Sequence, residues 1–332
     1  MYGKMPFLLK LIISLLVFAA MFVTAIVSGA ADIGLKDVWL ALFSGASSDD
    51  INVIREIRLP REAAAVFVGA ALAVSGAMMQ GMTRNPLADP SLLGLTSGAN
   101  AALAVTLAFL PAANYFWITV ACFIGAAIGA AIVFGLGATK RGGFSPFRIV
   151  LAGAAVSAFL SAFAEGIGLY FKISKDVSMW TAGGLIGTSW SQLQIVVPFI
   201  ACGLVIAIFL SRQLTILSLS EETAVGLGQK TIHIKAFLFI AITILAGAAV
   251  ALAGNLAFIG LMVPHVVRAI VGTDYRFIIP MSAVSGAIFM LFADLLGRTI
   301  NAPFETPVAA LVALFGLPFF LLIVRKGGRA FA

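Results

Sequence analysis

The sequence predicts an all-α protein that crosses a membrane many times, and three observations carry this prediction. Hydrophobic residues make up 61% of the 332 residues and charged residues only 11%, and the mean hydropathy is +1.10. A soluble domain carries about 25% charged residues, so this chain cannot cover a water-facing surface. Apolar runs of about 20 residues, the length that spans a bilayer, recur from end to end. We therefore expect one transmembrane domain over residues 1–332, a bundle of about ten helices.

The first apolar run follows Lys4 and resembles a signal peptide. It lacks a convincing small-residue cleavage site and is long enough to span, so we expect a retained first helix. A shorter segment, 262–272, opens at Pro264 and closes at Gly272. It is too short for a span and suits a half-helix packed inside protein. The full-length runs lie at 7–29, 63–82, 91–110, 115–138, 147–171, 192–211, 235–257, 277–297 and 304–324.

The positive charges indicate the orientation. If the N-terminus lies inside, two thirds of the 21 Lys and Arg residues fall in inside-facing segments. Cytoplasmic loops of membrane proteins carry such an excess. We therefore expect both termini to be cytoplasmic. The net charge of +7 does not indicate a nucleic-acid-binding surface. The Lys and Arg residues lie in short loops between apolar runs, so we interpret them as a topology signal.

Motifs for nucleotide binding, metal binding and catalysis are absent from the sequence. No GxxxxGKS or GxxxxGKT pattern occurs, and the nearest segment, 226–231, has the wrong spacing to place a lysine on phosphates. Cys122 and Cys202 lie in apolar runs without a CxxC or HExxH pattern. We expect neither an enzyme nor a bound cofactor or metal. Active transport would then draw its energy from a partner or an ion gradient.

The longest inside-facing loop, 212–235, contains the segment Glu221–Gly228. Ser220 can cap a helix that starts at Glu221, with acidic residues in its first turn and glycines at its end. The pattern predicts a short helix on the cytoplasmic face. Such a helix is either a solvated loop element or a docking surface for a cytoplasmic partner.

Two further segments place polar residues beside apolar runs. Arg58-Leu-Pro-Arg61 opens the second span on the outer side, against the positive-inside bias. These arginines either anchor a helix end or receive carboxylates of an extracellular protein. Asn85–Pro90 forms an inner turn whose prolines break the flanking helices. It is either a plain turn or part of a gate.

Two acidic residues fall inside apolar runs, where ionisable residues are functional candidates. Asp294 has Arg298 four residues later, which predicts an ion pair at a helix end. Glu165 has no partner nearby in the sequence and is a candidate for lining an aqueous pathway. If either acid bound a proton or an ion, the chain would be a gradient-driven secondary transporter. His265, after Pro264, is expected to pack or to cap the half-helix.

Several motifs together resemble one known family, the FecCD-type permeases of ABC importers for ferric siderophores, haem and vitamin B12. The likeness extends from about residue 7 to residue 326, with the motifs in the expected order and spacing. They are Arg58-Leu-Pro-Arg61, Gly69–Gly76, Gln80, Asn85–Pro90, Leu93-Gly94, Phe258–His265, Arg268 and Ala293-Asp294 to Arg298.

The resemblance implies a machine of several subunits in the bacterial cytoplasmic membrane. The permease works as a dimer, with a second copy or a paralogue, and its translocation path lies between the two subunits. Two cytoplasmic ATPases use the ATP and dock on the loop helix, 217–228 here. A substrate-binding protein docks outside and supplies most of the specificity. The residues do not distinguish a hydroxamate siderophore from a catecholate, haem or vitamin B12.

The resemblance also assigns roles to residues of this chain. The ATPase-coupling residues would be Glu221, Glu222, Ala224, Gly226, Leu227 and Gly228. The docking residues for glutamates of the binding protein would be Arg58, Arg61 and Arg298. The inner gate would comprise Asn85, Leu87, Ser145, Pro146 and Phe147, and the last three depart from the hydroxyl-rich sequence of some relatives.

Overall fold

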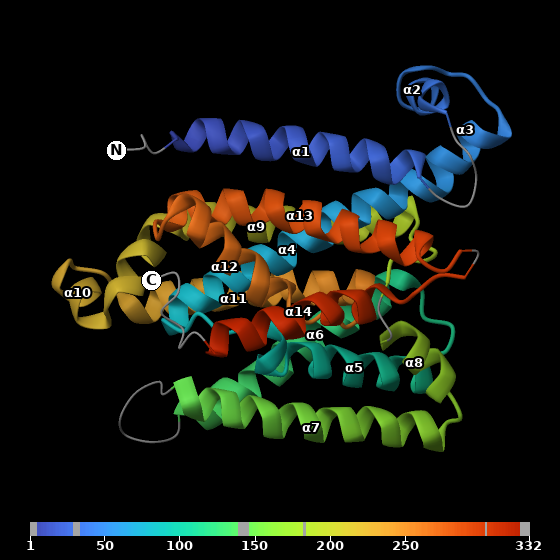
Figure 1. Ribbon diagram of the computed structural model, residues 1–332. Helices are drawn as coiled ribbons and strands as arrows, with labels where there is room; N and C mark the ends of the chain where they lie inside the picture. Colours follow the sequence, from blue (N-terminus) through green and yellow to red (C-terminus); the bar gives the residue numbers. More distant parts are fainter. Residues whose placement is uncertain (1–4, 29–33, 139–145, 182–183, 303, 326–332) are drawn as a thin grey trace.

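A computed structural model describes residues 5–28, 34–138, 146–181, 184–302 and 304–325. Within these residues the chain forms helices and no strand (Figure 1). Seven helices are long and apolar enough to cross a membrane, and three apolar helices are shorter. The prediction of an all-α, polytopic bundle is confirmed.

The helices fall into three groups by length and composition. The long apolar helices are α1 (Phe7–Val27), α4 (Leu59–Thr83), α6 (Tyr115–Ala138), α7 (Pro146–Tyr170), α9 (Trp190–Leu219), α11 (Thr231–Ala253) and α13 (Tyr275–Thr299). The shorter apolar helices are α5 (Leu95–Phe109), α12 (Ile259–Val271) and α14 (Val308–Arg325). Short connecting helices are α2 (Leu35–Phe43), α3 (Asp49–Val53), the π-helix η1 (Ile54–Arg58), the 3-10 helix η2 (Pro90–Leu93), α8 (Ser174–Thr181) and α10 (Glu221–Gly226).

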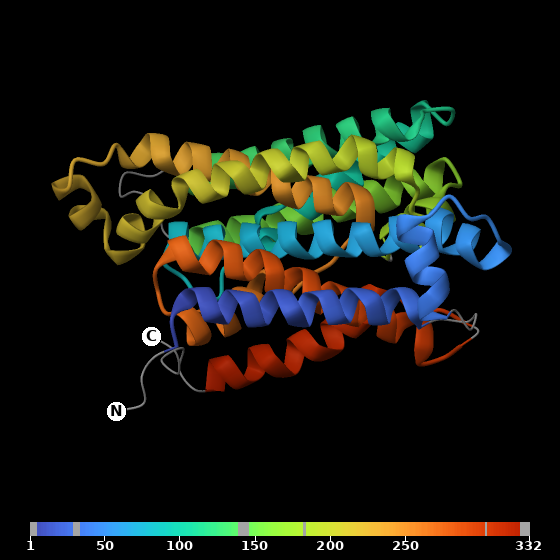
Figure 2. The same ribbon diagram turned by 90° about the horizontal axis from the view of Figure 1, so that it is seen from above.

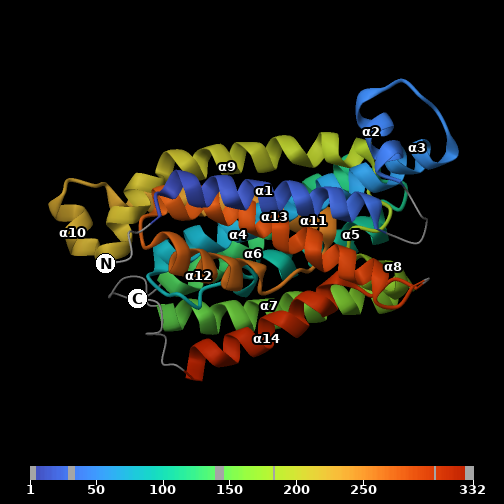
Figure 3. The same ribbon diagram turned by 45° about the horizontal axis from the view of Figure 1, so that its top comes forward.

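The long helices run along one common axis (Figures 1 and 2). The start of α1, the end of α14 and α10 lie at one end of the bundle, whereas α2, α3 and α8 lie at the opposite end (Figure 3). The first residues of α1 and the last residues of α14 therefore lie on one side of the bundle, which agrees with the predicted common side of the two termini. We call the end that carries α10 the inner end and the opposite end the outer end. At the outer end, α2 lies across the bundle axis (Figure 2).

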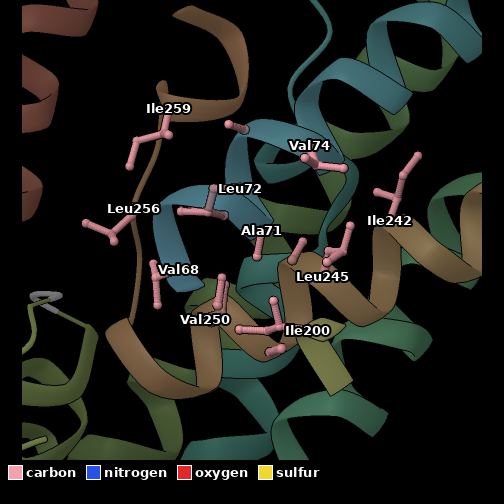
Figure 4. Packing of buried hydrophobic residues seen from close by; sticks show 14 of the residues in the cluster. Val68, Ala71, Leu72, Val74, Ile200, Ile242, Leu245, Val250, Leu256 and Ile259 are labelled. Atoms are coloured by element: carbon pink, nitrogen blue, oxygen red, sulfur yellow. The ribbon is translucent and has the colours of Figure 1, made fainter. Parts of the chain in front are cut away.

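Helix α4 forms the centre of the bundle. In its most apolar window 83% of the residues are buried, against 11% for α1, which lies at the edge. Figure 4 shows the packing around it, where side chains of α4 meet others from α9, α11 and the start of α12. The labelled residues are Val68, Ala71, Leu72, Val74, Ile200, Ile242, Leu245, Val250, Leu256 and Ile259.

Glycine pairs allow helix backbones to touch at several crossings. Gly76 of α4 lies against the backbone of Gly260 in α12, so that a Cβ at Gly76 would clash with the Gly260 carbonyl. Gly69 meets Gly286 of α13 in the same way. Lipid gives helices no hydrophobic drive to associate, so close backbone packing of this kind stabilises the bundle.

Helix α5 corrects the predicted span over residues 91–110. Residues 90–93 form η2, and Gly94, with φ of 73°, turns the chain before α5 begins. The 15 residues of α5 reach about 22 Å at 1.5 Å per residue, short of the roughly 30 Å of a bilayer core. The apolar run is continuous, but a left-handed glycine breaks the helix inside it.

Helix α12 confirms the predicted half-helix and corrects its start. It begins at Ile259, so Pro264 lies inside the helix and not at its beginning. Proline has no N–H to donate to the carbonyl four residues earlier, which is that of Gly260. The Nε2 group of Gln80 on α4 donates to the Gly260 oxygen (3.0 Å) and to the Leu261 oxygen (3.2 Å). A side chain of α4 thus replaces the backbone donor that Pro264 lacks.

Candidate functional site

Six charged side chains gather at the outer end, where α4 begins and α13 ends. Arg61 is central: its Nε and Nη2 groups donate to the carboxylate of Asp294 on α13 (2.9–3.1 Å). Its Nη1 and Nη2 groups also donate to Glu305 in the segment between α13 and α14 (2.8 and 2.9 Å). One guanidinium is therefore held by two carboxylates, each through paired hydrogen bonds.

Arg298 forms the second half of this outer cluster. Its Nη2 group donates to Glu62 of α4, and its Nε atom lies 3.1 Å from the Asp294 carboxylate. It also donates to the carbonyl oxygens of Ala25 (3.0 Å) and Ser28 (3.3 Å) at the end of α1. The predicted ion pair between Asp294 and Arg298 is confirmed. It belongs to a network that joins α1, α4 and α13.

Arg58 binds the end of α1 from the other side. Its Nη1 group donates to the carbonyl oxygens of Ile26 and Val27, the latter at 2.9 Å. The side chains of Arg58, Arg61 and Arg298 are all buried, at no more than 9% exposed. The three predicted docking arginines are thus brought together, but each is engaged within the chain.

Glu305 is the most exposed acid of the outer cluster. Its side chain is 33% exposed, whereas those of Asp294 and Glu62 are fully buried. Hydrogen bonds from Arg61 hold the pKa of Glu305 below its usual range, so its carboxylate is charged at neutral pH. The cluster contains three arginines and three carboxylates and is balanced in charge.

The inner end carries the predicted surface helix. The Ser220 hydroxyl accepts a hydrogen bond from the Thr223 amide (2.9 Å) and caps α10, as the sequence predicts. Ala224 packs inward and is fully buried, whereas Val225 and Leu227 are 57% and 65% exposed. The predicted segment 217–228 is wider than α10, because residues 217–219 complete α9. The result is a short helix with an apolar outer surface.

Glu221 attaches α10 to the body of the protein. Its carboxylate accepts a hydrogen bond from Lys235 of α11 (2.6 Å) and lies 3.9 Å from Arg84 at the end of α4. The hydrogen bond from Lys235 lowers the pKa of Glu221. Glu222, Gly226 and Gly228 are exposed beside it, and Gly228 ends the segment with φ of 78°. Arg84 directly precedes the predicted gate turn, so this ion pair links α10 to the residue before that turn.

The turn after α4 is held by its own polar groups. The Asn85 side chain accepts from the Leu87 amide (3.0 Å), and the Asp89 side chain accepts from the Ser91 amide (2.8 Å). Pro90, the last residue of the turn, packs against Gly260 near the start of α12, where its ring lies 3.2 Å from the place that a Cβ would take. Asn85 and Leu87 are half-buried. This turn therefore joins the end of α4 to the half-helix, an arrangement that suits both a plain turn and a gate.

The other predicted pathway residues lie on or near α7. Glu165 is exposed on this helix, as are Phe159 and Leu169, which are 69% and 73% exposed. α7 lies at the edge of the bundle in the view of Figure 1. Ser145 lies outside the described residues. Pro146 and Phe147 begin α7, and their side chains lie outside the described part of the structure.

Sequence reasoning missed the partners of the arginines. Glu62 and Glu305 were not singled out, although Glu62 directly follows Arg61 and Glu305 precedes the last apolar helix. It also missed Arg55, which donates to carbonyl oxygens of Leu40, Ala41, Ser44 and Ala46 and so fixes the end of α2. A charged residue beside an apolar run was the available signal in each case.

Comparisons with known proteins agree with this architecture. Residues 15–326 match the FecCD transport family. The chain is 48% identical over 302 residues to the iron(3+)-hydroxamate import system permease protein FhuB of Bacillus subtilis (strain 168), covering 91% of this chain and 79% of that protein. It is 41% identical over 331 residues to the iron-uptake system permease protein FeuB of the same organism, covering 99% of each.

Relatives in other bacteria and a solved structure extend the likeness. The hemin transport system permease protein HmuU of Yersinia pestis is 38% identical over 311 residues, covering 90% of this chain and 91% of that protein. The solved structure of a metal-chelate type ABC transporter in an inward-facing conformation matches with a TM-score of 0.84 at 26% identity, covering 96% of this chain and 99% of that chain. The chain therefore belongs to the FecCD transport family and is a multi-pass permease subunit of an ATP-binding-cassette importer in the cytoplasmic membrane.

Proposed function

We propose that this permease carries a ferric hydroxamate, or a closely related iron chelate, across the cytoplasmic membrane. The similarity to an iron(3+)-hydroxamate permease at 48% identity supports this cargo. A second copy or a paralogue completes the dimer, and the path lies between the two subunits. The exposed face of α7 with Glu165, and the turn with Asn85 and Leu87, line the path and its inner gate, together with the segment Ser145, Pro146 and Phe147.

The observation that carries the proposal is α10. It is a capped helix at the inner end, with Val225 and Leu227 exposed to solvent and with Glu221 bound to Lys235. An apolar surface of this kind on the cytoplasmic side suits a protein partner. Through Glu221 and Arg84 it also contacts the end of α4, next to the gate turn. A cytoplasmic ATPase that binds α10 can therefore move the gate turn through the end of α4.

At the outer end, the docking partner is a substrate-binding protein with acidic side chains. Arg58, Arg61 and Arg298 form the receiving cluster, because arginine forks match carboxylates in geometry. A cavity of about 620 Å³ opens near this end, with Tyr115, Trp180 and Gln192 in its lining. Its size suits a small-molecule chelate, and it gives the released cargo a place to enter.

A gradient-driven mechanism has less support in the side chains. It requires an intramembrane acid that exchanges protons or ions. Asp294 is held by Arg61 at 2.9 Å and lies 3.1 Å from Arg298, so it is already engaged by two arginines within the chain. Glu165 is the remaining candidate among the acids that the sequence singled out.

The test of the proposal is the loss of ATPase binding when the outer surface of α10 is changed. We expect Val225→Ser combined with Leu227→Ser to abolish co-purification of the ATPase subunit from detergent extracts. Ile57→Ser removes an equally exposed apolar side chain at the outer end and serves as the matched control. Co-purification that survives the double substitution, with the permease still eluting as a single species, would refute the role of α10.

A further inference from the structure

The arginine at the centre of the outer cluster is covered by a carboxylate of its own chain. Glu305 binds Arg61 through both of its oxygens, at 2.8 and 2.9 Å. The exposed fraction of the side chain is 33% for Glu305, 9% for Arg61 and zero for Asp294. The three groups therefore form a series from the solvent inward. Glu305 is the outermost member and lies between Arg61 and any partner outside.

The hydrogen bonds of Arg61 leave no edge of the guanidinium for another carboxylate. The edge formed by Nε and Nη2 binds Asp294, and the edge formed by Nη1 and Nη2 binds Glu305. A guanidinium has five N–H donors in a fixed fork, so a third paired contact requires one acid to leave. Asp294 is buried beside a second arginine, Arg298. Its departure would leave the buried guanidiniums of Arg61 and Arg298 without this counter-charge. Glu305 is the acid that can leave.

The charge balance leads to the same residue. In formal charge, Arg58, Arg61 and Arg298 are matched by Glu62, Asp294 and Glu305, and Glu305 is the one of these acids that faces an outside partner. Movement of Glu305 away from Arg61 uncovers one positive charge at the surface. An exposed positive charge raises the association rate and the specificity for an acidic partner more than it raises the affinity.

We propose that Glu305 is an internal occupant of the docking site, and that a carboxylate of the substrate-binding protein replaces it on Arg61. This inference rests on the proposed docking at the arginine cluster. One carboxylate is exchanged for another, so the hydrogen bonds of Arg61 are conserved and docking stays weak enough to reverse. The displaced Glu305 lies only three residues before α14, and the neighbouring Thr306 amide donates to Gly297 of α13 (2.8 Å). Docking therefore loosens the start of α14.

The first test measures binding of the substrate-binding protein to the permease–ATPase complex in lipid nanodiscs. We expect Glu305→Gln to bind it about fivefold more tightly, mainly through faster association at low salt. Glu56→Gln, which removes an exposed acid at the same end, should leave the affinity unchanged. Arg61→Gln combined with Asp294→Asn removes a matched pair of charges and should abolish docking.

The outcomes separate the two proposals. If Glu305→Gln binds equally or less tightly while the Arg61/Asp294 double variant loses docking, the arginine site stands and the role of Glu305 is wrong. If the double variant docks normally, the proposed docking site is itself wrong. Thermal unfolding of each complex verifies that the variants are folded.

A second measurement follows the displaced segment directly. A spin label at Phe304→Cys, with Cys122→Ala and Cys202→Ala, reports on the residue beside Glu305, where the side chain is 72% exposed. We expect the label to become more mobile when the substrate-binding protein is added. Adding Glu305→Gln should make it mobile without the partner. A label whose mobility is unchanged by docking would contradict the displacement of Glu305.

Discussion

Asp294 is the residue on which the outer end of the bundle depends most. Its side chain is fully buried, accepts hydrogen bonds from Arg61 and lies 3.1 Å from Arg298. A buried charge is costly unless it is paired, and removing one partner of a buried pair is more costly than lacking the pair altogether. The alternation of arginine and carboxylate is what permits six charges in so apolar a chain.

Substitution of Asp294 tests whether pairing of the buried charges stabilises the protein. Asp294→Asn leaves two buried guanidiniums without their shared counter-charge and should lower the free energy of unfolding by about 3–5 kcal/mol. Asp49→Asn, at an exposed position in α3, should change it by less than about 0.5 kcal/mol. Denaturant unfolding of the detergent-solubilised protein measures both. Equal effects in the two variants would show that the cluster contributes nothing to stability.

Glu221 provides a second residue-scale prediction, with a defined pH dependence. A double-mutant cycle with Glu221→Gln and Lys235→Met should give a coupling free energy of about 0.5 kcal/mol at neutral pH, since both groups are partly exposed. Lys235 lowers the pKa of Glu221, so this stabilisation is present above the usual pKa of about 4.5 and is lost as the pH falls through the lowered value. A coupling that grows in acid would contradict the assignment.

At the scale of elements, the hydrogen bonds from Gln80 of α4 to the backbone of α12 stabilise the half-helix. Gln80→Leu removes the donor on the Gly260 carbonyl, which Pro264 cannot replace. An unsatisfied buried carbonyl costs about 1–3 kcal/mol, so we expect a loss of stability in that range. Thr243→Val is the control, because the buried Thr243 hydroxyl bonds to none of the described residues. If thermal unfolding shifts equally in both variants, the donor role of Gln80 is wrong.

The elements that the sequence predicted well are those with local signals. The cap at Ser220 and the acids after it predicted α10, and Pro264 with Gly272 predicted a half-helix. Hydropathy did not predict the ends of helices that differ from the ends of the apolar runs. The apolar run 192–211 stops at Arg212, but α9 continues to Leu219, because helical hydrogen bonds need no lipid. The run 91–110 is mostly apolar and carries no charged residue, and only the backbone angle of Gly94 reveals where α5 starts.

At the scale of the whole molecule, the candidate site was predicted in part. The sequence pointed to Arg58, Arg61 and Arg298, and the structure places them at one end of the bundle. It could not show that Arg61 binds Asp294 and Glu305, which lie 233 and 244 residues away. Sequence spacing identifies partners within one helix, such as Asp294 and Arg298, but contacts between helices require the packed fold.

The whole molecule also explains how the two ends can work together. The central helix α4 begins in the outer cluster with Arg61 and ends beside α10 with Arg84. It is the most buried of the long apolar helices described, and glycine contacts hold it against α12 and α13. A rigid element of this kind can transmit a displacement from one end to the other. The proposed ATPase contact inside and the proposed docking outside therefore act on the same helix.

The most direct test of the account is the energy source of transport. Proteoliposomes containing this permease and its ATPase, with ATP inside and the substrate-binding protein outside, are supplied with a radiolabelled ferric hydroxamate. We expect uptake that requires internal ATP and that persists when ionophores collapse the ion gradients. Uptake driven by an ion gradient in vesicles that lack the ATPase would contradict it.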